Sequence, residues 1–199
     1  SMDAVSLGWS RMTYAADTGA VLHTTTSGGN VYAIPSGYAD AVKQLQANGC
    51  QLNLSVFMDN NGGALAAMLA DANGRSQAVQ AILTEATRTY TDLSSSPYTG
   101  VTIDFEGLAG STNQANFTAF LQALSQQLQA KNLRLAVAVM PATADGAYYN
   151  GYDYRAIGNL ADKVILMAHD YQPSKLTGYT GTTYYKNAAL TPFQSVYYS

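Results

Sequence analysis

The feature that most constrains the fold is a regular alternation of short apolar runs with helical stripes. Strands that alternate with helices build a parallel sheet with the helices packed outside it. The runs are rich in Val, Ile and Leu, as buried parallel strands are. Six strands are predicted, at Ala4–Trp9, Asn30–Ile34, Leu52–Met58, Gly100–Phe105, Leu133–Val139 and Lys163–Ala168.

Helical spacing of apolar residues lies between most of these strands. The predicted helices are Ala39–Asn48, Ser76–Leu93, a segment with an apolar stripe from Phe117 to Leu128, and the shorter Tyr154–Leu160. Ser111 or Thr112 is expected to cap the third helix, since a hydroxyl can accept from a free backbone N–H. One-sided stripes of this kind are core faces rather than ligand sites.

Two architectures fit an alternating α/β chain, an open doubly wound sheet and a (β/α) barrel. No G-x-G-x-x-G follows the first strand and no G-x-x-x-x-G-K-[ST] occurs, so the phosphate-binding loops of open-sheet enzymes are absent. A full barrel has eight strands in roughly 250 residues. We therefore expect residues 1–199 to form one domain with about six of the eight β/α units, whose first and sixth strands lack partners.

Composition excludes several classes of function. Only 12% of the residues are charged and the net charge is −3, whereas nucleic acid binding needs clustered Lys and Arg. No run is long enough to span a membrane, and Ser1-Met2-Asp3 begins no signal peptide. The single cysteine and two histidines have no metal-ligand spacing, so no metal site is predicted.

Acidic residues alternate along the segment Gly100–Phe105 and just past its end. In a strand, alternate residues share a face, so Thr102, Asp104 and Glu106 point one way and the apolar residues between them point the other. One reading is a pair of capping or salt-bridging acids. The functional reading is an acid pair in which one carboxylate raises the pKa of its neighbour, so that one donates a proton while the other is ionised.

This segment resembles the Asp-x-x-Asp-x-Asp-x-Glu signature at the end of the fourth barrel strand of glycoside hydrolase family 18. Asp104 and Glu106 match its last two acids, whereas Thr99 and Thr102 replace the earlier ones. By count, the segment is also the fourth predicted strand here. The chain resembles the peptidoglycan- and spore-lytic branch of the family more closely, because that branch often has a neutral polar residue at the position of Thr102.

The sixth predicted strand resembles a second family motif, Met-x-Tyr-Asp. Met167 and Asp170 match it, while His169 stands where the family usually has a substrate-binding Tyr, and Tyr171 follows. A lone histidine is more often structural than functional. Its place beside Asp170 at a strand end makes His169 a candidate for the site.

Weaker correspondences involve the other strands. In the place of the third-strand Ser-x-Gly-Gly pattern, only Ser55 matches. Met140, at the end of the fifth predicted strand, resembles the residue that forms the floor of the family's site there. Aromatic residues near strand ends are candidates for stacking on sugars; among Trp9, Tyr38, Tyr148, Tyr149, Tyr152 and Tyr171, the pair Tyr148-Tyr149 is favoured.

The resemblance implies a retaining glycosidase that uses the acetamido group of its substrate and needs no metal or cofactor. Glu106 would protonate the leaving oxygen and then act as base on water, and Asp104 would orient the amide and stabilise the charged intermediate, with Asp170 in the same site. The implied substrate is a β-linked polysaccharide containing N-acetylglucosamine, either chitin or peptidoglycan. A secreted or cell-wall location is the matching expectation.

Two other readings stay open at this point. A chitinase-like carbohydrate-binding protein without catalysis is favoured by Thr102, the altered third strand and His169, but the presence of Glu106 opposes it. An unrelated α/β protein with a sugar or nucleotide ligand is opposed by the absence of phosphate-binding loops. Neither the oligomeric state nor the mode of cleavage follows from the sequence.

Overall fold

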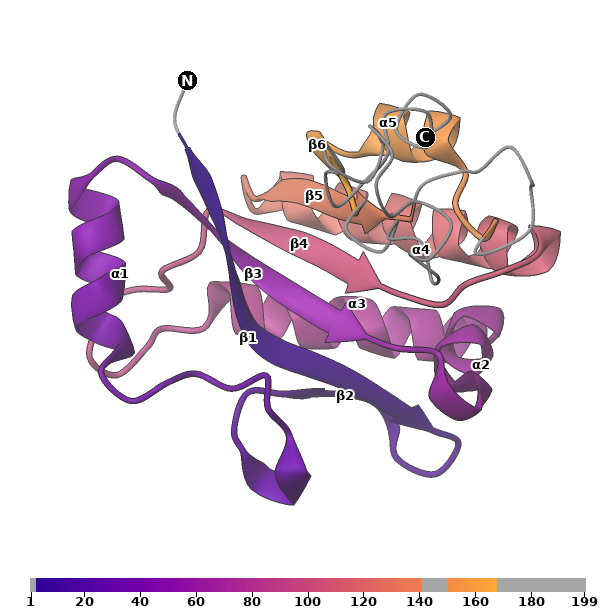
Figure 1. The fold of residues 1–199 in the computed structure, drawn as a ribbon, viewed down its shortest axis with the longest axis horizontal. Coiled ribbons are helices and arrows are strands. Elements are labelled where there is room, and N and C mark those ends of the chain that lie inside the picture. The colour runs from indigo at the N-terminus through magenta and orange to yellow at the C-terminus, as the bar shows by residue number, and fades with distance from the viewer. Residues whose placement is uncertain (1–2, 141–149, 168–199) are drawn as a thin grey trace, which may run out of the picture.

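The structure is a computed structural model that describes residues 3–140 and 150–167. Its centre is a six-stranded, mostly parallel sheet in the order β2-β1-β3-β4-β5-β6, with α3 and α4 behind it in the view of Figure 1. The strands are β1 (Ala4–Ala15), β2 (Gly19–His23), β3 (Gln51–Met58), β4 (Gly100–Phe105), β5 (Arg134–Val139) and β6 (Lys163–Leu166). The predicted α/β class and parallel sheet are confirmed.

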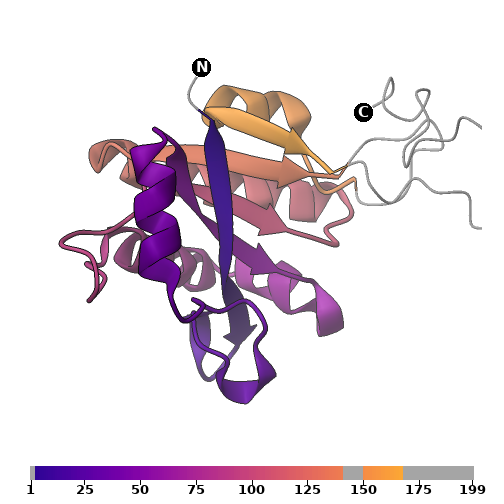
Figure 2. The same ribbon diagram turned by 60° about the vertical axis from the view of Figure 1, so that its left-hand side comes forward.

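Five helices connect these strands in the described part of the chain. They are α1 (Tyr38–Ala47), α2 (Ala64–Ala70), α3 (Ala72–Thr87), α4 (Ser111–Ala130) and α5 (Tyr154–Leu160), and two single 3₁₀ turns occur at η1 (Ser27–Gly29) and η2 (Asn61–Gly63). Turning the molecule, as in Figure 2, shows α1 at one side of the sheet and β6 at the opposite end from the β1–β2 hairpin. No helix in the described ranges is both long and apolar enough to cross a membrane.

The second strand is not the one predicted. Gly19, at φ +70°, lets the chain turn back after Asp17, whose carboxylate accepts from the N–H of Thr18 at 2.9 Å. The returning strand β2 pairs antiparallel with the end of β1, from Arg11 to Ala15. The segment 30–34, predicted as a strand, lies instead in the loop before α1. As a result, β4 is the fourth strand in chain order but the third of the parallel strands.

The sheet is open within the described residues, not a closed six-stranded barrel. The expectation that the first strand lacks a partner on one side is wrong over the second half of β1, because β2 covers that edge. At the other end, β6 pairs with β5, and the described part of the chain supplies it with no second neighbour.

Two helix boundaries differ from prediction for local reasons. The carboxylate of Asp71 accepts from the N–H groups of Asn73 and Gly74, and this cap starts α3 four residues before the predicted Ser76. The extended backbone of Arg88 ends it at Thr87. The N-cap of α4 is a glycine without a side-chain cap, so the predicted capping role of Ser111 or Thr112 is wrong. The helix α2 was not predicted.

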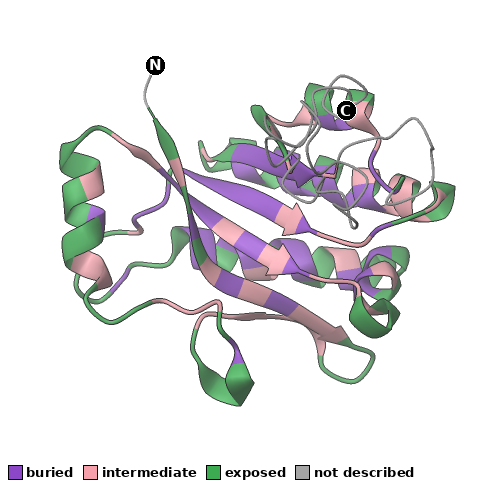
Figure 3. Ribbon diagram, in the orientation of Figure 1, coloured by how far each residue is buried: buried purple, intermediate pink, exposed green. Residues whose placement is uncertain are grey.

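The core lies between the sheet and the helices behind it. The odd-numbered residues of β4, Val101, Ile103 and Phe105, are fully buried, and the ring of Phe105 lies 6.0 Å and 5.3 Å from those of Phe117 and Phe120 in α4. Figure 3 shows this burial as purple bands along the central strands. Packing of these residues against α4 leaves the even-numbered residues of β4 on the opposite face.

Candidate active site

Asp104 lies on the face of β4 that is turned away from α4, and Glu106 follows directly after the end of the strand. The strand is central, with β3 on one side and β5 on the other. Asp104 is in parallel register with Phe57 of β3, and the N–H of Glu106 donates to the carbonyl oxygen of Met58 at 2.9 Å. The backbone ladder therefore extends to Glu106 and holds both half-buried acids at the carboxyl end of the sheet, where α/β barrels carry their catalytic groups.

The two threonines that replace acids of the family signature make hydrogen bonds to neighbouring strands of the sheet. Thr102 is only 3% exposed, and its hydroxyl lies 2.8 Å from the hydroxyl of Ser6 and accepts from the amide of Asn53 at 3.3 Å. Thr99 accepts from the N–H of Leu52 at 3.0 Å. The hydroxyl of Thr102 is buried and bonds to Ser6 and Asn53. A role for Thr102 in substrate binding stays a prediction.

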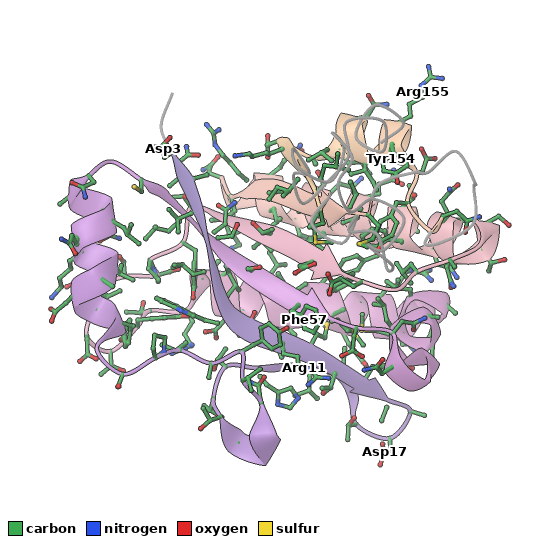
Figure 4. All side chains as sticks on the ribbon, viewed as in Figure 1. Asp3, Arg11, Asp17, Phe57, Tyr154 and Arg155 are labelled. Carbon is green, nitrogen blue, oxygen red and sulfur yellow. The ribbon has the colours of Figure 1, made fainter. Side chains whose placement is uncertain are left out.

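An ion pair lies across the sheet from the acids. Arg11 of β1 is in register with Phe57, which is in register with Asp104, so the three side chains form one row on the same face. Figure 4 shows Arg11 and Phe57 together on the face toward the viewer. The guanidinium of Arg11 donates to the carboxylate of Asp59 at 3.0 Å. This row places a cation two strands away from Asp104.

Tyr32 was not predicted as a site residue, yet the fold brings it to the acids. Its ring stacks on that of Phe57, with 4.4 Å between the centroids and 14° between the planes. Burial, followed by the charges of Glu106 and Asp104, raises the pKa of its hydroxyl above the usual value, and the positive charge of Arg11 acts in the opposite direction. No local motif points to this residue, since it reaches the site through a loop.

Two tyrosines fix the backbone around the site. The hydroxyl of Tyr152 donates to the carbonyl oxygen of Phe105 at 2.5 Å, and that of Tyr154 donates to the carbonyl oxygen of Met140. Burial raises the pKa of Tyr152, the charges of Glu106 and Asp104 add to the shift, and a backbone hydrogen bond at Leu108 opposes it. Tyr152 is 1% exposed, so the prediction that it could stack on a sugar is wrong.

Of the remaining predicted residues, the structure describes Met140, Met167 and Trp9. Met140 and Met167 follow β5 and β6, and the N–H of Met167 donates to the carbonyl oxygen of Val139 at 3.0 Å. Trp9 lies edge-on to Tyr38 of α1, with centroids 6.2 Å apart. Their binding roles stay predictions. The predicted residues that lie outside the described part of the chain are Tyr148, Tyr149, His169, Asp170 and Tyr171.

In the described ranges, no three His, Cys, Asp or Glu side chains come together as a group that could hold a metal ion. The site holds a pair of carboxylic acids at the end of a central strand. Such a pair can donate a proton and stabilise a positive charge.

Known proteins resemble this chain in both sequence and fold. It is 39% identical over 83 residues to the candidate sporulation-specific glycosylase YdhD of Bacillus subtilis (strain 168). The aligned segment covers 41% of this chain and 20% of that protein. The crystal structure of a chitinase from Chromobacterium violaceum ATCC 12472 matches 86% of this chain and 50% of its own at 28% identity, with a TM-score of 0.62.

The fold alone is also shared with the C-terminal domain of a candidate chitinase from Desulfitobacterium hafniense DCB-2. The match has a TM-score of 0.66 at 23% identity, and it covers 86% of this chain and 47% of that one. The chain thus spans about half the length of these solved structures. The sequence model of the glycosyl hydrolases family 18 matches residues 22–197. By this match over most of its length, the chain belongs to the glycosyl hydrolases family 18.

Proposed function

We propose that the protein carrying this chain is a glycosidase that cleaves β-linked polysaccharides containing N-acetylglucosamine. The observation that carries the proposal is the position of the two acids in the fold: Asp104 lies at the carboxyl end of the central strand β4 and Glu106 follows directly after it. Family membership and the likeness to a chitinase and a candidate sporulation-specific glycosylase support this substrate class.

The proposed mechanism uses the acetamido group of the substrate as the nucleophile. Glu106 donates its proton to the glycosidic oxygen while the carbonyl oxygen of the acetamido group attacks the anomeric carbon. Asp104, two residues earlier on the same face, orients the amide and stabilises the positive charge of the cyclic intermediate. Glu106 then removes a proton from water, which opens the intermediate with retention of configuration.

Peptidoglycan is the substrate that we favour over chitin. The support is the relative YdhD, named for sporulation, together with the neutral Thr102 at a position where the spore-lytic branch often has a polar residue without charge. A secreted or cell-wall location follows from either polymer, because both lie outside the cytoplasm. The predicted contribution of Asp170 to the same site belongs to this proposal.

The experiment is to replace Glu106 with Gln in the protein that carries this chain and to measure hydrolysis and binding separately. Loss of a general acid should lower turnover of N-acetylglucosamine oligomers or purified peptidoglycan by about 10²-fold or more, while the affinity for the same glycan is largely kept. A Gln variant that hydrolyses as fast as the parent would eliminate the mechanism.

A binding protein without catalysis is the second candidate, because Thr102 cannot ionise and its hydroxyl bonds to Ser6 and Asn53. The same experiment separates the two candidates. A parent protein that binds the oligomers but releases no reducing ends at any enzyme concentration would favour the binding protein.

A further inference from the structure

The loop that carries Tyr32 is held in place by a buried amide. Asn30 is 8% exposed, and its side-chain nitrogen donates to the carbonyl oxygens of Thr25 and Tyr32 at 2.8 Å and 2.9 Å. Its side-chain oxygen accepts from the N–H of Tyr32 at 3.1 Å. The N–H of Ile34 also donates to the carbonyl oxygen of Thr24 at 2.8 Å. The backbone on both sides of Tyr32 is therefore fixed without a strand ladder.

This fixed loop lays the ring of Tyr32 over a residue of the site. Phe57 occupies the row between Arg11 and Asp104, and the two aromatic rings are nearly parallel at 4.4 Å. Both rings are only partly buried. Counted from Ser55, Phe57 stands where the Ser-x-Gly-Gly pattern has its first glycine, so an aromatic ring occupies that position in this chain.

The hydroxyl of Tyr32 makes no hydrogen bond to a group in the described part of the chain, although its backbone groups do. The charges of Glu106, Asp104, Arg11 and Asp59 all act on this hydroxyl. A half-buried phenol that has no partner among the described residues, and on which the charges of Glu106 and Asp104 act, is suited to donate to a ligand.

We propose that Tyr32 and Phe57 form a sugar-binding wall on the β3 side of the acid pair, with the ring pair contacting the C–H face of a pyranose and the Tyr32 hydroxyl bonding to a sugar hydroxyl. Sugars offer an apolar face and polar edges, and a tyrosine stacked on a second ring presents the same combination. The wall rests on the proposed function, since it assigns one binding subsite of that reaction.

The test uses the tetramer of N-acetylglucosamine and the full protein that carries this chain with Glu106→Gln, so that the ligand survives while its Kd is measured by calorimetry. In that background, Tyr32→Phe should weaken binding by about threefold to fivefold, the scale of one hydrogen bond. Tyr32→Ala should weaken it by about tenfold or more, because the stack is lost as well. The matched control is Tyr14→Phe on β1, which removes a hydroxyl that donates to Asp71, and it should leave Kd unchanged.

Two results would overturn the wall. One is a folded Tyr32→Ala protein with the Kd of its parent; the other, if that variant does not fold, is a Tyr32→Phe protein whose Kd matches the control. In the active enzyme, Tyr32→Phe should raise KM and leave kcat nearly unchanged, a split that a purely structural residue would not produce. If the Glu106→Gln parent binds no oligomer while the active protein cleaves none, the proposed function fails, and the wall fails with it.

Discussion

The hydroxyl of Tyr152 donates to the backbone carbonyl oxygen of Phe105, the residue between the two acids, at 2.5 Å. Tyr152 is itself anchored, because it is fully buried and its ring meets that of Phe117 edge-on at 5.5 Å. The hydrogen bond therefore ties the backbone that carries Asp104 and Glu106 to the helix layer. Since burial raises the pKa of Tyr152, the hydroxyl keeps its proton and remains a donor at neutral pH.

Replacing Tyr152 with Phe should reduce both stability and turnover. The carbonyl oxygen of Phe105 would lose its buried donor, at a cost of about 1–2 kcal/mol in the free energy of unfolding. Relaxation of the strand end should also lower kcat. Urea unfolding and steady-state kinetics measure the two effects. Tyr90→Phe, which removes a buried hydroxyl that donates to Glu85 at 2.8 Å, should cost similar stability but leave kcat unchanged; equal loss of kcat in both variants would contradict the positioning role.

Replacing Asp104 with Asn should impair chemistry more than binding. The side chain keeps its size and its place in the row with Phe57, but it can no longer balance the positive charge that develops on the intermediate. We expect kcat to fall by about 10²-fold, the scale of losing one electrostatic contact in the transition state, with KM changed much less. A variant whose KM rises while kcat holds would mean that Asp104 only binds substrate.

Gly107 is the turn that ends the strand directly after Glu106. Its φ is +85°, and a Cβ added there would lie 3.3 Å from the Cβ of Asn60. The amide of Asn60 donates to the carbonyl oxygen of Gly107 at 3.4 Å and its oxygen accepts from the N–H of Ala66 at 2.9 Å. An added methyl group would thus strain the turn and press on a residue that joins β3 to α2.

Gly107→Ala should therefore lower the free energy of unfolding by about 1–3 kcal/mol, the cost of a strained backbone, and reduce kcat through the displaced Glu106. Gly8→Ala is the control, because no atom lies within 4 Å of its added Cβ and its φ is not positive. Thermal denaturation of both variants gives the comparison. Equal melting temperatures for the two would show that the turn tolerates a side chain.

The central strands could be predicted from sequence, whereas the edge of the sheet could not. Apolar runs around Leu54, Ile103 and Val137 predict buried strands because few other structures accept them. The run from Val31 to Ile34 looks similar, but the side chain of Asn30 bonds to the backbone there and replaces the ladder. The strand that does form, Gly19–His23, is short and depends on a turn at Gly19.

The site shows the same division between local and distant information. Asp104 and Glu106 could be predicted because alternation within one strand decides which face they share. The approach of Tyr32 to Phe57 joins residues 25 positions apart in the chain through a loop, and the row of Arg11 beside Phe57 depends on the register between strands. Neither arrangement has a periodicity or motif from which it could be read.

The buried tyrosines give the last prediction, a loss of stability at alkaline pH. Tyr90 bonds to the hydroxyl of Tyr98 at 2.5 Å, and burial is the main cause that raises the pKa of both above the usual value of 10.0. Below about pH 10 the folded and unfolded chains both hold these protons, so stability does not depend on them. Above it the unfolded chain releases protons that the folded chain keeps, which favours unfolding.

The free energy of unfolding should therefore stay level up to about pH 9 and then fall above about pH 10, by up to ~1.4 kcal/mol per pH unit for each such tyrosine. Tyr90→Phe removes one titrating group, so its stability should be lower at pH 8 but should decline less steeply above pH 10. Tyr14→Phe is the comparison: desolvation and the charge of Asp71 raise the pKa of Tyr14 too, but its hydroxyl bonds to Asp71 at the surface. Its loss should therefore change the alkaline slope less than Tyr90→Phe does. Urea titrations between pH 8 and 11 measure the slopes, and a Tyr90→Phe slope as steep as the parent's would show that this hydroxyl does not control alkaline unfolding.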